Sequence, residues 1–376
     1  MSTIKVNKIE NTSTTDGGVS IDVDGHVQID GQQMPTAGPL SNRSLIINGA
    51  MTVAQRGTSH TSQHNSNNYG VDRFKVSIGN SLAVITHSQE TTGAPDGFQN
   101  WLKVVVTTAD TSIGAGDYGI IAQQIEGYNF AHVNYGTSNA QEVTVSFKFK
   151  TNKAGTYCMI HRNNAANRNY IHEFTPVADG NWQTITYTVP GDTTGTWDKT
   201  NNIGWSWELC IANGTSFQSS TVDSWFGGQF FHSTPNQVNF LDSTSNELGI
   251  TGVQVELGSK TTPFEHEHYS QTLAKCQRYF QINGRLFGIW FTVDGMRYIH
   301  PCSSTMRAAP SGQLLDPDGY HEYWNLQGYT NIGSLGTFRG DSTTVDFQIY
   351  SNTNRGRSYG DPAMLGEGIV GFNAEL

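Results

Sequence analysis

Residues 249–281 read GITGVQVELGSKTTPFEHEHYSQTLAKCQRYFQ, which is the most informative stretch of the chain. In its first half, apolar side chains alternate with polar ones: Ile250, Val253, Val255 and Leu257 against Thr251, Gln254 and Glu256. That alternation is typical of a half-buried strand. Gly258 and Pro263 then predict a turn, because glycine tolerates positive φ and proline fixes φ at about −65°.

The second half of this stretch predicts a short helix over residues 269–281. Its apolar side chains recur at the spacing of one helical face: Tyr269, Leu273, Cys276 and Phe280. A strand therefore leads directly into a short helix.

Upstream, residues 42–263 hold short alternating runs separated by turn residues, without helical periodicity. The runs are Phe74–Ile78, Leu82–Thr86, Trp101–Thr107, Val143–Phe149, Tyr157–His161, Trp182–Val189, Ile203–Ala212 and Ile250–Leu257. Such runs indicate stacked antiparallel sheets. Downstream, residues 283–376 alternate again and predict a smaller β-sandwich domain. We therefore predict an all-β chain, an antiparallel β-sandwich with a short N-terminal β-ribbon and a short helix.

The N-terminal ribbon is predicted from its turns. Asp24-Gly25 and Asp30-Gly31 are hairpin dipeptides, because Asp and Gly accept the positive φ of tight turns. A ribbon this short cannot be stable alone, so we expect it to pair with other copies or to anchor the chain on another protein. Its apolar side chains would carry that role: Ile4, Val6, Ile9, Val19, Ile21 and Val23. A frayed tail is the alternative.

These patterns divide the chain into four parts. Residues 1–38 form the ribbon, 39–268 the sandwich, 269–282 the connecting helix and 283–376 the C-terminal β domain. A chain of 376 residues is longer than most single domains, which agrees with more than one compact unit.

The composition excludes several classes of function. Hydrophobic residues make up 36% and charged residues 14%, and the resulting excess of small polar residues with 11% aromatics is typical of extracellular β-sandwiches. A net charge of −10 disfavours nucleic acid as a partner, because binding by counterion release needs a basic surface. No apolar run reaches the roughly 18 residues of a membrane span, so we expect no membrane insertion.

The quoted stretch resembles a segment of bacteriophage tail-fibre-like virion proteins, in which a pattern close to TGVQLE-G-TPFEHR-Y-ELA-CQRYY recurs. Glu267 and His268 depart from it, where the family shows Arg and a small residue. Two further blocks carry the same resemblance: LIINGAMTVAQRG at 45–57 with YGVDRF at 69–74, and the end of the chain with MRAAP at 306–310 and NAEL at 373–376.

The order of features from LIINGAM to TGVQVELG also resembles jelly-roll carbohydrate-binding modules, with GNWQTITYTVPGDTTGTW and WSWELCIANGTSF as further points of likeness. The resemblance implies a jelly roll for residues 39–268, a homotrimer, and a structural role for the turn at 264–266. It also allows for one structural calcium ion. We expect no other cofactor, and the residues leave the identity of any metal ligands unknown.

The cysteines and the N-terminus bear on location. Cys158, Cys210, Cys276 and Cys302 form no CxxC pair, which favours buried free thiols over a disulfide frame or zinc site. The opening MSTIKVNKIENTS lacks the apolar segment of a secretion signal. We therefore expect a virion component that assembles in the host cytoplasm and is extracellular in the mature particle.

Glycan recognition uses flat aromatic faces with amides and carboxylates in a preformed site. Trp197 and Trp225 lie in or beside loops rich in small polar residues, so we take them as candidate glycan contacts. The C-terminal run DGYHEYWNLQGYTN adds Tyr320, Tyr323, Trp324 and Tyr329, for which a subunit interface is an equal alternative. Trp101, Trp182, Trp205 and Trp207 are instead expected in the core or at a sheet edge.

Catalysis and metal binding find little support in the sequence. Glu265, His266, Glu267 and His268 offer at most a pair of ligands on one side of an extended segment, which is too few for a closed site. No carboxylate pair stands in a catalytic motif, and HExxH and P-loop patterns are absent. We expect no enzyme.

The sequence thus predicts a non-enzymatic phage tail fibre or adhesin, anchored to other virion proteins by its N-terminus, that binds host surface polysaccharide through its sandwich domains. The first alternative is a virion structural protein without receptor duty, such as a head fibre, capsid decoration or collar component. The second is a polysaccharide depolymerase.

Overall fold

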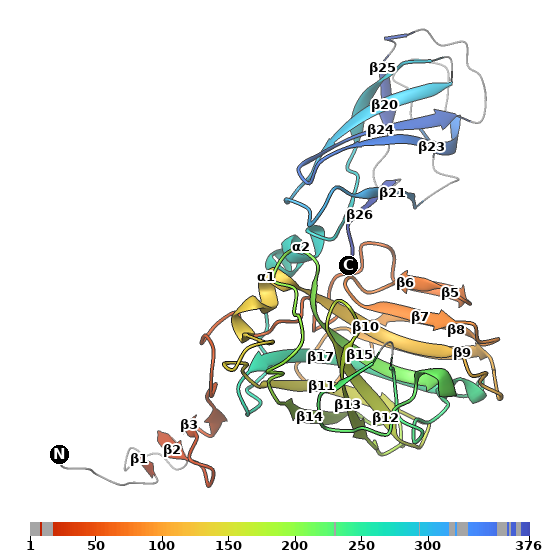
Figure 1. Cartoon of the computed structure of the whole chain (residues 1–376). Helices are drawn as coiled ribbons and strands as arrows, with labels where there is room; N and C mark the ends of the chain where they lie inside the picture. Colours follow the sequence, from red (N-terminus) through yellow and green to blue (C-terminus); the bar gives the residue numbers. More distant parts are fainter. Residues whose placement is uncertain are drawn as a thin grey trace. The chain divides into compact units, whose positions relative to one another are not determined.

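The computed structural model describes residues 8–9, 18–228, 231–292, 294–315, 320–321, 330–351, 359–360, 362–365 and 370–376. The chain falls into two compact units. The first comprises Met1–Met51, Ser59–Asn68 and Lys75–Glu267, and the second comprises Thr52–Thr58, Tyr69–Phe74 and His268–Leu376. The ribbon thus groups with the sandwich, and the helix groups with the C-terminal domain. The predicted all-β class is confirmed, because strands that pair antiparallel dominate both units (Figure 1).

The N-terminal ribbon is a four-stranded sheet in chain order. Its strands are β1 (Lys8–Ile9), β2 (Val19–Ile21), β3 (Val27–Ile29) and β4 (Gln32–Gln33). The predicted turns are confirmed, since φ is 88° at Gly25, 49° at Asp30 and 74° at Gly31. The register places Ile9 opposite Val19, Val19 opposite Ile29, and Ile21 opposite Val27.

Two larger sheets form the sandwich of the first unit. The seven-stranded sheet has the order β16 (Phe226–Gly227), β13 (Arg168–Phe174), β12 (Tyr157–Arg162), β15 (Ile203–Asn213), β10 (Tyr118–Glu126), β7 (Lys75–Gly79) and β6 (Asn67–Tyr69). The six-stranded sheet has the order β14 (Gln183–Val189), β11 (Val143–Thr151), β17 (Glu247–Leu257), β9 (Trp101–Thr108), β8 (Val84–Glu90) and β5 (Ser59–Gln63). One short helix, α1 (Gly127–Phe130), and the 3-10 turns η1 (Ala131–Val133), η2 (Thr215–Phe217) and η3 (Phe240–Asp242) lie in the connections.

Aromatic side chains from both sheets meet in the core between them. Phe147 of β11 packs edge-on against Trp207 of β15, with ring centroids 5.7 Å apart. Phe149 of β11 packs against Tyr157 of β12 at 5.4 Å. These side chains are 0–1% exposed, which confirms the expectation that Trp207 is buried. Contacts of this kind hold the two sheets face to face and give the sandwich a rigid interior.

A buried ion pair also ties neighbouring strands of the seven-stranded sheet together. Glu208 of β15 is 1% exposed and accepts hydrogen bonds from Arg162 Nη2 at 2.6 and 2.7 Å. His232 Nδ1 lies 3.6 Å from the same carboxylate. Burial raises the pKa of Glu208, but Arg162 and His232 outweigh it and hold that pKa far below its usual range. A carboxylate held ionised in this way cannot act as a proton donor.

The predicted helix exists but is shorter than expected. Helix α2 spans Tyr269–Gln277, and Phe280 opens the following strand β18 (Phe280–Ile282). The predicted apolar face is wrong at Tyr269, which is 60% exposed, while Thr272 and Cys276 are buried. The buried face of the helix is therefore rotated about the helix axis relative to the face that the apolar spacing predicted.

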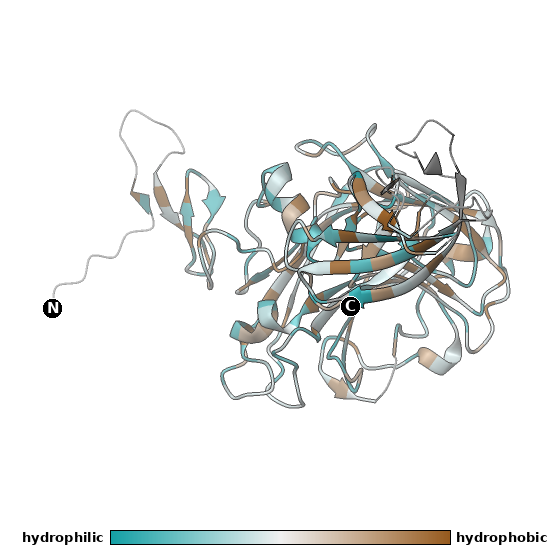
Figure 2. Cartoon of the chain, turned by 90° about the horizontal axis from the view of Figure 1, so that it is seen from above, coloured by the Kyte–Doolittle hydropathy of each residue, from teal (hydrophilic) through white to brown (hydrophobic). Residues whose placement is uncertain are grey.

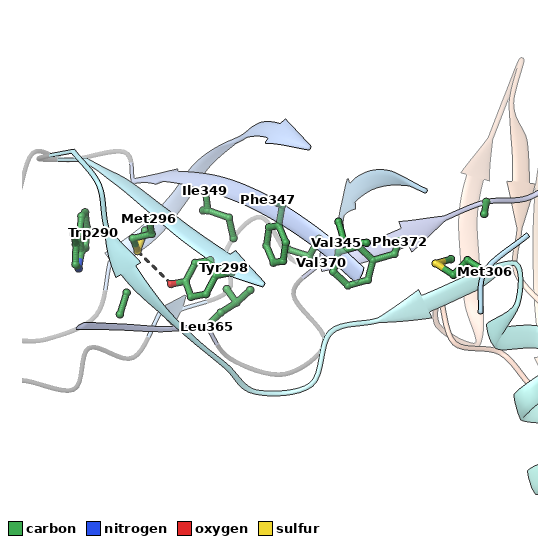
Figure 3. Close-up of a cluster of buried hydrophobic side chains, with 12 residues drawn as sticks. Trp290, Met296, Tyr298, Met306, Val345, Phe347, Ile349, Leu365, Val370 and Phe372 are labelled. Carbon is green, nitrogen blue, oxygen red and sulfur yellow. Dashed lines mark hydrogen bonds between the residues drawn. The ribbon is translucent and has the colours of Figure 1, made fainter. Parts of the chain in front are cut away.

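The second unit contains two further sheets. One is three-stranded, with the order β18, β26 (Val370–Asn373) and β21 (Ser311–Leu314). The other is six-stranded, with the order β22 (Tyr320–His321), β23 (Thr330–Gly340), β24 (Thr344–Ser351), β20 (Gly295–Pro301), β19 (Leu286–Trp290) and β25 (Pro362–Leu365). Figure 3 shows their shared core, in which Phe347 packs against Tyr298 at 5.6 Å and against Phe372 at 5.5 Å.

Charged side chains are buried in the second unit where the blocks that resemble the phage proteins meet. The guanidinium of Arg73 pairs with Glu375 and lies 3.5 Å from the ring centroid of Tyr279. Arg56 contacts the other carboxylate oxygen of Glu375 at 3.4 Å and lies 3.5 Å from the ring centroid of Phe280. Both arginines and Glu375 have side chains no more than 5% exposed. Segments distant in the sequence are thus joined by one buried charge network.

All four cysteines are free, and Cys158, Cys210 and Cys276 are buried while Cys302 is half-buried. Among the described residues, no helix has both the length and the apolar character that crossing a membrane requires.

Candidate functional site

One part of the six-stranded sandwich sheet displays aromatic and charged side chains together on its outer face. Along β9, Leu102 and Val104 are fully buried in the core, whereas Trp101 and Lys103 have the opposite parity and project from the other face. Lys150 of β11 is on the same outer face, because it is paired with Gly249 of β17, which in turn is paired with Lys103.

The turn between β8 and β9 fixes two indole rings on this face. Nε1 of Trp101 donates to the carbonyl of Thr92, and Nε1 of Trp182 donates to the carbonyl of Gly93, each at 2.8 Å. The two rings are perpendicular, with centroids 5.5 Å apart. Trp101 is 3% exposed, and Trp182, immediately before β14, is half-buried. Trp182 therefore presents part of a rigidly held ring to solvent.

Gly249 makes room for this arrangement. A Cβ atom at this position would lie 2.8 Å from atoms of the Trp101 ring and 2.9 Å from Cε of Lys150, closer than Cβ contacts normally allow. The absence of a side chain at Gly249 therefore lets Trp101 lie across the sheet beneath the stem of Lys150.

Lys150 lies over both indoles. Its Nζ is 3.7 Å from the ring centroid of Trp101 and 4.9 Å from that of Trp182. Burial lowers the pKa of Lys150 from its ordinary value, with Lys103 acting in the same direction, while Glu247 and Glu90 oppose the shift. Cation–π contacts of this kind are worth about 0.5–2 kcal/mol, depending on desolvation. We call Trp101, Trp182, Lys103, Lys150 and Glu247 the tryptophan–lysine patch.

A pocket of about 260 Å³ opens beside the patch. Its lining includes Lys150 and Glu247, together with Thr151, Asn152, Gly180 and Ser245. Lys103 Nζ lies 3.0 Å from a carboxylate oxygen of Glu247, so that acid is neutralised within the patch. The volume is just below the lower end of the 300–1,000 Å³ typical of small-molecule sites, which suits a single ring-sized group.

Chemically, the patch combines an apolar aromatic surface with an ammonium and a carboxylate on a rigid sheet. Apolar C–H faces of a ligand could lie on Trp182, and hydroxyl groups could donate to Glu247 or accept from Lys150.

A second pocket of about 540 Å³ lies elsewhere in the first unit. It is lined by His26, Thr36, Ala37, Ala140, Gln141, Glu142, Pro190, Gly191, Gly258 and Ser259, a set without Trp, Tyr or Phe. Nearby, ligand atoms of Asp22, Asp24 and His26 lie within 4.8 Å of one another. Lys260 pairs with Asp24 at 2.6 Å and Asp22 accepts the backbone N–H of His26 at 2.8 Å, so these acids already have partners within the protein.

The predicted glycan contacts have different outcomes. Trp197 is 6% exposed and packs edge-on against Tyr135 and Trp225, at 4.9 and 5.2 Å. Its ring has no free face for a sugar, so the prediction is wrong for this residue. Trp225 is half-buried, and its Nε1 donates to the carbonyl of Pro190 at 2.7 Å.

The side chains of the other predicted glycan contacts are not among those that the structure describes. Tyr323, Trp324 and Tyr329 lie outside the described residues, and only the backbone of Tyr320, in β22, is described. Of the predicted anchor residues, Ile4 and Val6 also lie outside the described residues, whereas Ile9, Val19, Ile21 and Val23 are exposed.

Trp182 lies at a sheet edge, as predicted, because it immediately precedes β14, the outermost strand of the six-stranded sheet. That prediction does not by itself indicate a patch. A signal was present in the letters FKFK at 147–150, where Phe147 and Phe149 point into the core and Lys148 and Lys150 point out. The turn at 264–266 does have the structural role expected, since the carboxylate of Glu265 accepts the backbone N–H of Asn42 and of Arg43, each at 2.6 Å.

A scan against protein-family models finds no match, and a search of the curated proteins finds none. Among solved structures, the chain is similar to the enzymatically active domain of tailspike protein 4 of bacteriophage CBA120, at 11% identity and a TM-score of 0.30 over 53% of this chain and 21% of that one.

It is also similar to the family 11 carbohydrate-binding module of the cellulosomal cellulase Lic26A-Cel5E of Clostridium thermocellum, at 16% identity and a TM-score of 0.28 over 55% of this chain and 98% of that one. A third structure is the C-terminal family 22 carbohydrate-binding module of Clostridium thermocellum Xyn10B, at 12% identity and a TM-score of 0.29 over 53% of this chain and 99% of that one. Likeness at this level is too distant to assign a site.

Proposed function

We propose that the chain is a non-enzymatic tail fibre or adhesin of a bacteriophage particle, and that its sandwich binds host surface glycans at the tryptophan–lysine patch. The observation that carries the proposal is the half-buried ring of Trp182 beside a 260 Å³ pocket lined by Lys150 and Glu247. An aromatic platform next to charged hydrogen-bonding groups suits the two faces of a sugar ring, one apolar and one rich in hydroxyls.

The rigidity of the site supports this function. Both indoles are tied to the turn at 92–93, and Leu102 and Val104 of β9 lie in the core behind them. A preformed site loses little conformational freedom on binding, so even a small contact area gives measurable affinity. Modest affinity per site would be raised by many copies on one particle.

The ribbon supports attachment to the virion and assembly as a homotrimer. Its strands expose aliphatic side chains in aligned rows: Ile9, Val19, Ile21, Val27 and Ile29 are 39–64% exposed. Figure 2 shows these strands with hydrophobic segments in brown. Sheets this short are not stable without further burial, and copies of the same face or a virion protein would supply it.

The site is tested by titrating polysaccharide from the host surface into the full chain and into Trp182→Ala. We expect affinity to fall about tenfold to 100-fold, the loss of one stacking platform. Trp225→Ala is the matched control, because it removes another half-buried indole far from the pocket lining. Retained binding by Trp182→Ala together with loss in Trp225→Ala would place the site elsewhere.

A virion structural protein without receptor duty is the second candidate, favoured by the exposed ribbon, which such a protein also needs. A cryo-EM map of the particle distinguishes the two. A fibre at the tail with its sandwich exposed supports the adhesin, whereas a place in the head or collar, with normal adsorption after its removal, supports the second candidate. Release of reducing sugar ends from host polysaccharide would instead establish a depolymerase.

A further inference from the structure

Lys150 differs from the neighbouring lysines in its partners. Lys103 pairs with Glu247 at 3.0 Å, Lys153 pairs with Asp242 at 2.6 Å, and Lys148 donates to Thr184 Oγ1 at 2.7 Å. Within the described residues, the ammonium of Lys150 has no carboxylate within 4.0 Å and no hydrogen-bond acceptor, and its contacts are the two indole rings.

The position of Lys150 makes it a functional group of the pocket. Its stem passes over Gly249 and its side chain lines the 260 Å³ pocket, so the ammonium is partly removed from water. A partly desolvated cation without a counter-ion is unfavourable, and an anion that enters beside it relieves that cost. The acid of the lining, Glu247, favours the charged form of Lys150 but makes its ion pair with Lys103, so Lys150 is left without a direct carboxylate contact.

We propose that the glycan bound at the tryptophan–lysine patch is an anionic sugar, whose carboxylate or phosphate pairs with Lys150 while an apolar face of the sugar ring lies on Trp182. This inference rests on the proposed function and adds the class of ligand. The anion takes the place that a protein carboxylate takes at Lys103 and Lys153. A neutral sugar would leave the ammonium of Lys150 with hydroxyl acceptors only.

The test uses the full chain on an array of immobilised polysaccharides in three groups: uronate polymers, phosphate-bearing polymers and neutral glucans. We expect the best anionic polymer to bind at least about tenfold more tightly than any neutral one, which corresponds to about 1.4 kcal/mol. Comparison of the uronate and phosphate groups shows which anion the site prefers. The preference should weaken between low and high salt, because the ion pair is screened.

The matched variants are Lys150→Met and Lys148→Met. Methionine keeps the apolar stem over the indoles and removes the charge. We expect Lys150→Met to bind anionic and neutral polymers equally, and Lys148→Met to keep the preference, since Lys148 is on the same face but donates to Thr184. Thermal melting of both variants shows whether the fold is retained.

The outcomes separate this inference from the function beneath it. Equal binding of anionic and neutral polymers by the wild type overturns the anionic-sugar inference and leaves glycan binding in place. Binding to no polymer, including the phage's own host polysaccharide, overturns the proposed function itself. An anionic preference that survives in Lys150→Met places the anion elsewhere and also overturns the inference.

A second measurement reports on the ion pair directly. The pKa of Lys150, followed by NMR of labelled lysine side chains, should rise when the anionic ligand binds, because a nearby anion favours the charged form. The side-chain signal of Lys148 in the same spectra is the control and should not move on binding. An unchanged pKa at Lys150 in the saturated complex would contradict the pairing.

Discussion

The ribbon and the tryptophan–lysine patch both expose apolar side chains, but they differ in what lies behind them. The ribbon strands β2 and β3 are three residues long. Their valines and isoleucines are exposed, and only the polar residues between them, Ser20 and Gln28, are half-buried. The patch stands on strands of the six-stranded sheet whose other face carries fully buried Leu102, Val104 and Phe149. One surface needs a partner to be stable, and the other is stable before any partner arrives.

The chemistry of the two surfaces differs in the same sense. The ribbon exposes branched aliphatic side chains in rows, a surface that another protein chain or another copy can cover. The patch exposes part of an indole ring beside an ammonium and a carboxylate, which suits a polar ligand with an apolar face. Changes in the ribbon should therefore alter assembly and leave glycan binding intact, and changes in the patch should do the reverse.

The largest effect is expected from Glu208→Gln, which tests how strongly the ion pair inside the sandwich stabilises its fold. The change leaves Arg162, whose side chain is only 12% exposed, without its counter-ion, so we expect the free energy of unfolding to fall by about 3–5 kcal/mol. Chemical denaturation followed by tryptophan fluorescence measures it. Lys153→Met, which breaks a half-buried ion pair with Asp242 at the surface, is the control and should lower the free energy of unfolding by less than about 1 kcal/mol. Similar losses in both variants would contradict this account of the core.

The next effect is the dependence of the sandwich's stability on pH. Burial, with a small contribution from His60, lowers the pKa of His87 to about 3, and burial lowers that of His161 to about 3. Both histidines are neutral in the folded state. The unfolded chain binds protons at these histidines below a pKa of about 6.5, so the stabilisation of the folded state is complete above that pH and is lost as pH falls towards 3. Lowering the pH from 7 to 5 should therefore reduce the free energy of unfolding by about 2 kcal/mol for each of these histidines.

His87→Phe sharpens this test. His87 is fully buried, is stacked on His60 at 5.0 Å and has no hydrogen bond from its ring nitrogens within the described structure, so phenylalanine should fit the site. When the pH is lowered from 7 to 5, the free energy of unfolding should fall by about 2 kcal/mol less in the variant than in the wild type. Thermal melting at each pH measures the difference. An unchanged pH dependence would show that His87 is not the group that titrates.

The ribbon is tested by Ile21→Asp. A charge in the exposed apolar row should weaken self-association by at least about tenfold, because each copy loses one buried isoleucine and gains a desolvated carboxylate. Sedimentation equilibrium gives the mass. Gln28→Asp, on the polar parity of β3, is the control. A full chain that is already a monomer, with its ribbon packed on its own body, would overturn the homotrimer proposal.

The smallest effect is expected from Trp225→Ala. Its indole is half-buried against Trp197 and Tyr135, away from the residues that line the 260 Å³ pocket. Glycan affinity should remain within about twofold of the wild type. A larger loss, with the fold intact by thermal melting, would restore the loop tryptophans as the binding site.

Much of the fold could be predicted from the sequence, because apolar and polar side chains alternate along a strand that buries only one face. The run at 250–257 lies within β17, and the run at 143–149 lies within β11. Strand β10 was missed because Ile120, Ile121 and Ala122 are consecutive and all buried, so no alternation marks it. Strand β13 was missed because its core-facing side chains include Tyr170 and His172, which do not read as an apolar face.

The candidate site could be predicted less well. A position in a polar loop favours an aromatic residue as a glycan contact, yet Trp197 folds back into a buried aromatic cluster. Trp182 precedes a strand, and its exposure follows from the turn at 92–93, which is distant in the sequence. Side-chain parity along one strand is visible in the letters, but the meeting of β9, β11 and β17 around Gly249 is not.

The most direct test of the account is a structure of the full chain with an anionic oligosaccharide from the host surface bound. We predict a sugar ring on the exposed part of Trp182, with its carboxylate or phosphate within hydrogen-bond distance of Lys150 Nζ. A sugar bound at Trp225 or in the 540 Å³ pocket, with the patch empty, would contradict it.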